Sequence, residues 1–154
     1  ENALENPPSG ARYMTLMKMG QAASMAGSLD EAFMAYDQAS AISDRPDPFF
    51  QLGHISFLQD RDAEKSLLFF EEAIKRDPND YASLFRAAFM KATLGDLEGA
   101  AEYSRKSYRL FREDRQNVEF LSAILAKLGQ TEEALRLERE ANYLQQLEIE
   151  QANK

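Results

Sequence analysis

Small residues recur along this chain at a spacing of 34 residues. Two columns share this spacing, and every member is alanine or serine: Ala32, Ser66, Ala100 and Ala134 in one column, and Ala39, Ala73, Ser107 and Ala141 in the other. Because alanine and serine make up only 33 of the 154 residues, chance produces this agreement with a probability of about 4 × 10⁻⁶, or about 10⁻⁴ once every frame is tried. The sequence therefore predicts four copies of one structural unit.

The residues around these columns resemble the tetratricopeptide repeat, a unit of two helices joined by a turn. A glycine followed five residues later by the recurring small residue opens the turn at Gly27, Gly95 and Gly129, whereas Arg61 stands in that place in the second repeat. The second repeat carries the closing run of the family from Phe69 to Asp80. The resemblance implies repeats over about residues 13–45, 46–80, 81–114 and 115–148, a flexible leader over residues 1–12, and the end of the last helix over residues 149–154.

The expected fold class is all-α: a right-handed α-solenoid of four helix-turn-helix repeats with an extended C-terminal helix. The apolar residues have helical spacing, and no segment alternates as a strand would. Small residues let paired helices approach closely, and bulkier neighbours should fill the space between repeats: Leu16, Met19, Phe33, Tyr36, Phe49, Leu52, Leu67, Phe70, Leu84, Tyr108, Val118, Leu121 and Leu135. Ser28, Asp47 and Asp80 have the character of helix starts. The last helix should run from about Thr131 to about Glu150, because neither glycine nor proline interrupts it.

Composition excludes several classes of function. The formal net charge of −8 disfavours a nucleic-acid surface, which needs a basic stripe. The sequence has no run of 18 apolar residues, so no membrane span is expected. The absence of cysteine excludes disulfides and is compatible with a cytoplasmic or a periplasmic location. The sequence does not distinguish between these two compartments.

Catalytic and metal-binding patterns are also missing, so the chain is not expected to be an enzyme and no cofactor is expected. His54 is the only histidine, which leaves a nucleophile–histidine pair or a multi-histidine metal site incomplete. Asp60, Asp62 and Glu64 alternate in a turn, but the glycine and distant glutamate of a calcium loop are absent. We interpret these acidic residues as a solvated turn at a helix N-terminus.

The resemblance also implies a ligand site, because in this family the first helix of each repeat lines a concave groove. The matching positions of the first three repeats give a mostly apolar set: Met14, Met17, Gln21, Phe50, His54, Phe57, Phe85 and Phe89. Methionine and phenylalanine suit an apolar partner. Two other interpretations stay open, namely that these rings belong to the core, or that the leader or the C-terminal helix of the chain covers them.

The family's carboxylate clamp, which holds acidic chaperone tails, is not matched, since the equivalent positions carry no cation. We therefore expect a non-catalytic adaptor or assembly chaperone, similar to bacterial secretion and envelope assembly factors, that binds an apolar peptide or amphipathic helix of a protein partner. The alternative is a structural self-association module, a homodimer formed through the C-terminal helix, with an apolar stripe at Leu137, Leu144 and Leu147.

Overall fold

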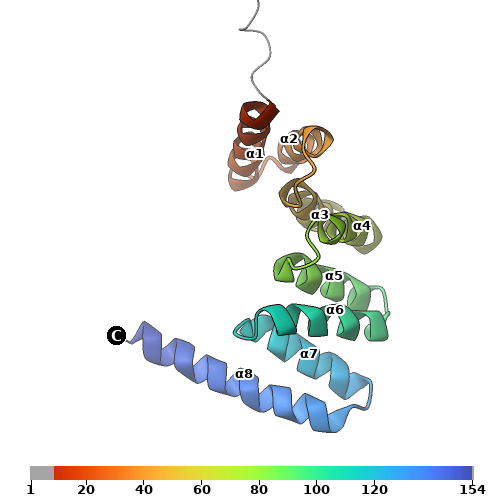
Figure 1. Ribbon diagram of the computed structural model, residues 1–154, viewed down its shortest axis with the longest axis vertical. Coiled ribbons are helices and arrows are strands. Elements are labelled where there is room, and N and C mark those ends of the chain that lie inside the picture. Colours follow the sequence, from red (N-terminus) through yellow and green to blue (C-terminus); the bar gives the residue numbers. More distant parts are fainter. Residues whose placement is uncertain (1–8, 154) are drawn as a thin grey trace, which may run out of the picture. The chain divides into compact units, whose positions relative to one another are not determined.

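The computed structural model describes residues 9–153, which form eight α-helices and no strand (Figure 1). The helices are α1 (Ser9–Met25), α2 (Leu29–Ile42), α3 (Asp47–Asp60), α4 (Ala63–Arg76), α5 (Tyr81–Thr93), α6 (Leu97–Leu110), α7 (Arg115–Lys127) and α8 (Thr131–Ala152). The all-α prediction is confirmed.

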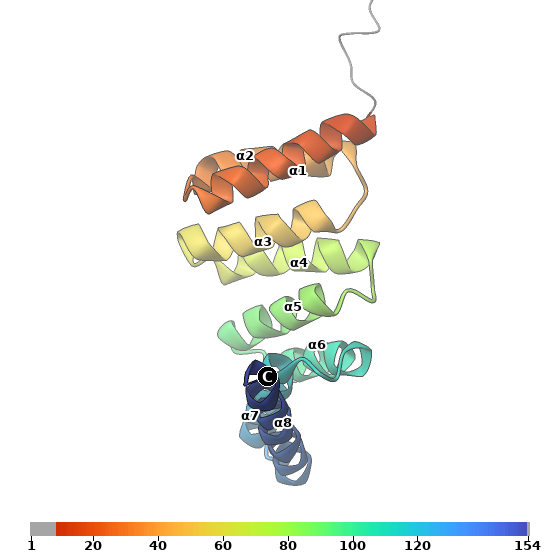
Figure 2. The same cartoon turned by 90° about the vertical axis from the view of Figure 1, so that its left-hand side faces the viewer.

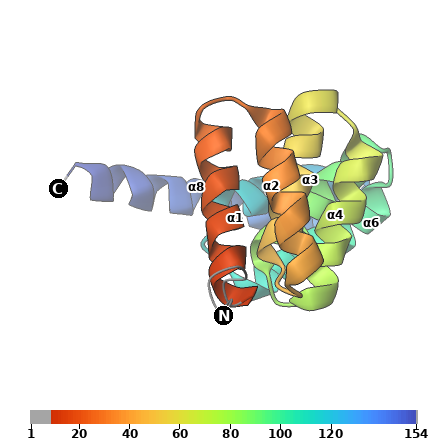
Figure 3. The same ribbon diagram turned by 90° about the horizontal axis from the view of Figure 1, so that it is seen from above.

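Each repeat is an antiparallel pair of helices, and the chain divides after Pro78 into two compact units. Unit 1 contains α1–α4, and unit 2 contains α5–α8. The pairs α1–α2 and α3–α4 lie side by side in Figure 2, and Figure 3 shows α1 next to α2 from above. Within each unit the second helix of one repeat also contacts the first helix of the next, α2 with α3 and α6 with α7.

The two columns of small residues lie at the helix crossings, as predicted. All eight side chains are buried, at 0–4% exposure. In unit 1 a glycine of the first helix faces an aromatic ring of the second. A Cβ at Gly20 would come within 2.6 Å of Tyr36, and a Cβ at Gly53 within 2.9 Å of Phe70. The small residues are thus required by the close approach of the helices.

Two of the predicted core residues are instead exposed. Met19 on α1 is 56% exposed and Leu135 on α8 is 50% exposed. Their equivalents in inner repeats, Leu52 and Ala101, are buried at 0% and 2%. The prediction was wrong because no described repeat precedes α1 or follows α8, so these faces have no neighbour to cover them.

Aspartate side chains cap four of the eight described helices. Asp62, Asp80, Asp96 and Asp114 each accept a hydrogen bond from a backbone N–H of the first turn that follows, an arrangement that satisfies otherwise unpaired donors. Of the predicted starts, Asp80 is confirmed. Ser28 takes the cap position without a side-chain hydrogen bond, whereas Asp47 is the first residue of α3 and not its cap.

The ends of the array differ slightly from the prediction. Helix α1 begins at Ser9, so residues 9–12 are helical rather than part of a flexible leader; they continue the first helix, and the glycine among them, Gly10, lies in its first turn. Residues 1–8 of that predicted leader lie outside the described residues. Helix α8 runs from Thr131 to Ala152, two residues beyond the predicted end, and projects past α7 (Figure 1). Between residues 9 and 153, no helix is long and apolar enough to cross a membrane.

Candidate functional site

The first helices of unit 1, α1 and α3, carry six of the predicted groove residues. Met14 is 50% exposed and lines a small hollow of about 150 Å³ with Ile42 and Arg45. Gln21 is exposed. Met17 is half-buried and packs against the cores at both ends of α1, one around Tyr13 and the other around Leu52. The α1 part of the predicted groove therefore combines accessible and structural side chains.

The aromatic residues of α3 are less exposed than predicted. Phe50 is half-buried, because its ring packs edge-on against the core residue Phe70 with 5.6 Å between ring centroids. Phe57 is half-buried under the guanidinium of Arg61, 5.5 Å from its ring centroid. His54 lies between them along α3 and is also half-buried. These three side chains are therefore only partly accessible.

In unit 2 the aromatic residues of the predicted groove form a cluster that joins two helices. Phe85 and Phe89 on α5 both contact Phe120 on α7, with centroid separations of 5.6 and 5.9 Å. Phe89 is 40% exposed, and the other two rings are half-buried. We call Phe85, Phe89 and Phe120 the aromatic cluster. In this cluster Phe85 packs edge-on against Phe120, and Phe89, the most exposed of the three rings, is tilted against Phe120.

Sequence reasoning missed Phe120. The family's ligand columns in the fourth repeat fall on Gln116, Glu119, Ala123 and Ala126, and these are all exposed. Phe120 lies one position after Glu119, in a column that the family resemblance does not assign to the ligand. The only available signal was the presence of an aromatic residue in an otherwise small and polar helix face.

A cation does accompany the third-repeat aromatic pair. The guanidinium carbon of Arg86 lies 5.9 Å from the ring centroid of Phe85, within the range of a weak cation–π contact. Phe85 and Phe89, which occupy positions equivalent to the third-repeat part of the family's carboxylate clamp, carry no charge. The aromatic pair itself is therefore apolar, with one cation beside it.

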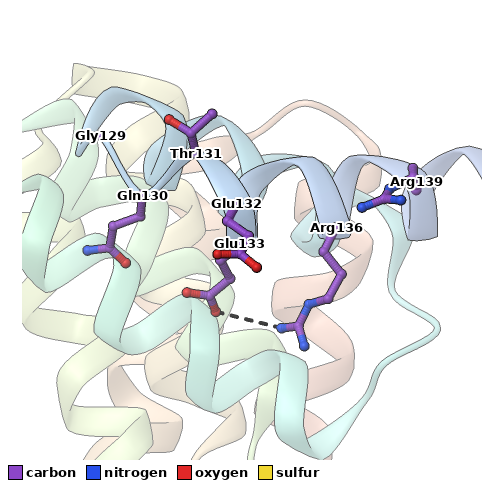
Figure 4. Close-up of a pocket in the computed structure, with 7 residues that line it drawn as sticks. All are labelled: Gly129, Gln130, Thr131, Glu132, Glu133, Arg136 and Arg139. Carbon is purple, nitrogen blue, oxygen red and sulfur yellow. Dashed lines mark ion pairs between the residues drawn. The ribbon is translucent and has the colours of Figure 1, made fainter.

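A separate hollow of about 700 Å³ lies at the start of α8, lined by residues from Gly129 to Arg139 (Figure 4). One of its carboxylates is paired within unit 2: Glu133 forms ion pairs with Arg105 at 2.8 Å and with Arg136 at 3.9 Å. The hydrogen bond from Arg105 lowers the pKa of the Glu133 carboxyl. The pair of Arg105 and Glu133 joins α6 to α8, so we assign this pair a structural role.

Several solved structures have a fold similar to that of this chain. One structure of MamA superimposes with a TM-score of 0.81 at 14% identity, covering 90% of this chain and 81% of that one. A MamA double mutant gives a TM-score of 0.78 at 16% identity, covering 88% and 76%. YrrB, described as a TPR protein with an unusual peptide-binding site, gives 0.73 at 17% identity, covering 86% and 69%. No family model matches the sequence, and no curated protein matches it.

These likenesses confirm the fold that the repeat predicts. The chain has the tetratricopeptide-repeat fold, an all-helical array of helix-turn-helix units. At identities of 14–17% the likeness concerns the fold and not the ligand.

Proposed function

We propose that this chain is a non-catalytic protein-interaction module that binds an apolar peptide or the apolar face of an amphipathic helix. The aromatic cluster carries the proposal, because an exposed ring supported by two edge-packed rings is a favourable anchor for an apolar side chain. In this role the chain serves as an adaptor or assembly chaperone. Methionine side chains on α1 add an adaptable apolar surface in unit 1.

Supporting evidence comes from the kind of fold and from the charge of the face. YrrB, which has this fold, is described as having a peptide-binding site. The three rings of the aromatic cluster are apolar, and the cation beside them is Arg86, which suits an apolar ligand better than an acidic tail. We expect a peptide that ends in an acidic chaperone tail to bind weakly, because Arg86 alone cannot replace a clamp of several cations.

Binding of a designed amphipathic peptide with a leucine-rich face, measured by fluorescence anisotropy, tests the proposal. Phe89→Ala should weaken binding by about tenfold or more, since one anchor ring contributes about 1.5–3 kcal/mol. Phe111→Ala is a matched control, because Phe111 has a similar exposure of 38% but follows α6 and packs against Tyr81. Equal losses in the two variants, or tighter binding of the acidic tail, would refute the proposed site.

Self-association through the C-terminal helix is less well supported. Leu137 is fully buried within unit 2, and Leu144 packs against the same core. Arg115 on α7 also holds Glu148 on α8 at 2.9 Å. The apolar stripe that suggested dimerisation is thus largely used to attach α8 to its own unit.

A further inference from the structure

A groove between α7 and α8 is lined by residues at the positions that contact the next repeat elsewhere in the chain. It has a volume of about 430 Å³, and its wall includes Glu119, Ala123, Leu135 and Glu138. Shifted back by one 34-residue repeat, these positions become Phe85, Phe89, Ala101 and Ser104. All four of those residues lie at the contact between α7 and the α5–α6 pair. The α7–α8 groove is therefore the equivalent surface of the last repeat, and no described helix of this chain occupies it.

The residues of α7 that contact the equivalent surface of α5 and α6 indicate which side chains an occupant of the α7–α8 groove should carry. Phe120 contacts Phe85 and Phe89, and Asn117 exchanges hydrogen bonds with Ser104. Leu121 lies in the same hydrophobic core as Ala101. In the α7–α8 groove Glu119 stands at the position of Phe85, and Glu138 at the position of Ser104. An occupant would therefore contact two glutamates instead of a phenylalanine and a serine. It should therefore be a first helix of a repeat, with a cation in place of Phe120.

Helix α1 has that pattern. Aligned by repeat, its Thr15, Lys18 and Met19 correspond to Asn117, Phe120 and Leu121 of α7. All three α1 residues are exposed, Met19 by 56%, whereas its counterparts Leu52 and Leu121 are buried at 0% and 1%. The first helix thus presents an uncovered repeat-contact face, with a lysine at the position that would face Glu119.

Charge favours the same pairing. Between Ser9 and Met25 the ionisable side chains that carry charge at neutral pH are Arg12 and Lys18, and none is acidic. The groove wall carries Glu138, for which the described part of the structure shows no ion pair, and Glu119, which pairs with Arg115 of its own helix at 2.5 Å; the wall itself has no lysine or arginine. Opposite charges on two otherwise apolar surfaces guide association and set its register.

We propose that α1 of a second copy of this chain docks in the α7–α8 groove, so that copies associate head to tail. In this contact Met19 is buried against the groove, Lys18 approaches Glu119 as a second cation beside Arg115, and Thr15 lies near Glu138. The contact joins two different surfaces and leaves one free end of each kind on every dimer, so association can continue beyond two copies. It uses neither Phe85 nor Phe89, and it is independent of peptide binding by the aromatic cluster.

Sedimentation velocity of the 154-residue chain from about 10 µM to about 1 mM tests the proposal. The average mass of the wild type should rise with concentration, and Lys18→Glu or Glu119→Lys should each weaken association by about tenfold or more. Arg109→Glu makes the same change of charge on α6, outside the groove, and should leave association unchanged. Glu138→Lys, which alters the second carboxylate of the groove, should also weaken it.

Mixing the two charge variants gives the sharpest test. Lys18→Glu retains a normal groove and Glu119→Lys retains a normal α1, so each variant supplies the surface that the other lacks, and an equimolar mixture should associate at concentrations where neither variant does alone. Combining both changes in one chain should restore association, because the ion pair is re-formed with reversed polarity. A wild type that stays monomeric throughout, or a mixture no more associated than its components, would overturn the proposal. Circular dichroism of each variant verifies that its helix content is unchanged.

Discussion

The ring of Phe70 lies against the backbone of Gly53 where α3 crosses α4. A Cβ at Gly53 would come within 2.9–3.0 Å of three ring atoms, and Phe70 is only 1% exposed, so its ring has little room to move. In unit 2 the same crossing pairs Ala88 with Ser104, both fully buried. A side chain with a Cβ is thus accommodated on α5 because the equivalent partner on α6 is a small residue and not an aromatic ring. The size of one residue in each repeat is fitted to the size of the other.

This fit makes Gly53→Ala a destabilising change. Alanine favours a helix over glycine by about 1 kcal/mol, but the clash with Phe70 should outweigh that gain and leave a net loss of about 1–2 kcal/mol. Urea denaturation measures the difference. Gly10→Ala is the matched control, since no atom lies within 4 Å of its added Cβ, and it should not lose stability. A stabilised Gly53→Ala variant would show that the ring moves freely.

Arg61 adopts the left-handed conformation that glycine adopts in the other three repeats. Its φ of 55° compares with 79°, 87° and 76° at Gly27, Gly95 and Gly129. Because a side chain in this conformation costs about 1 kcal/mol, Arg61→Gly should stabilise the chain by up to about that amount, raising the urea midpoint. Arg61→Ala, which removes the contact with Phe57 but keeps the strain, should give no such gain. Equal effects in both variants would contradict the conformational explanation.

A buried polar pair joins α6 to α7. The hydroxyl of Ser104 donates to Oδ1 of Asn117 at 2.6 Å, and Nδ2 of Asn117 donates to the Ser104 carbonyl at 3.1 Å. Both side chains are fully buried. Asn117→Ala should therefore cost about 2–3 kcal/mol in the free energy of unfolding, because it leaves polar groups without partners. The double variant with Ser104→Ala should lose less than the sum of the two single changes.

The contact between Phe85 and Phe120 changes the stability loss expected when a ring of the aromatic cluster is removed. Full exposure of Phe85 would make Phe85→Ala neutral for stability, but its ring rests on Phe120. We expect a loss of about 2 kcal/mol for Phe85→Ala and less than about 1 kcal/mol for Phe89→Ala, which is more exposed. Thermal unfolding of both variants measures this order. A larger loss of stability for Phe89→Ala than for Phe85→Ala would mean that Phe89, and not Phe85, is the more buried ring.

The C-terminal end of α8 stabilises unit 2. Removal of residues 144–154 deletes Leu144, which packs on the core, and Glu148, which pairs with Arg115. The free energy of unfolding should fall by about 2 kcal/mol, whereas removal of residues 150–154 alone should have no measurable effect. The longer deletion leaves Glu119 and Glu138 in place, so head-to-tail association should persist. Dimers that dissociate on this deletion would instead indicate pairing through the C-terminal helix.

The sequence alone determined the repeat and therefore the fold. A period of 34 residues with small residues at two columns requires paired helices, since only a close helix crossing excludes larger side chains at both columns. The length of α8 also followed from local sequence, because no residue in it stops a helix. These features depend on neighbours close in the chain, which the sequence displays directly.

Tertiary structure decided which faces are covered. Met19 and Leu135 have the apolar character of core residues, yet they are exposed because no described repeat lies beside them. Phe50 and Phe85 are half-buried because Phe70 and Phe120, from other helices, meet their rings. The open α7–α8 groove and the uncovered face of α1 have the same origin, since the first and last described repeats each lack one neighbour. The exposure of a side chain depends on residues distant in sequence, and these are brought beside it only when the chain folds.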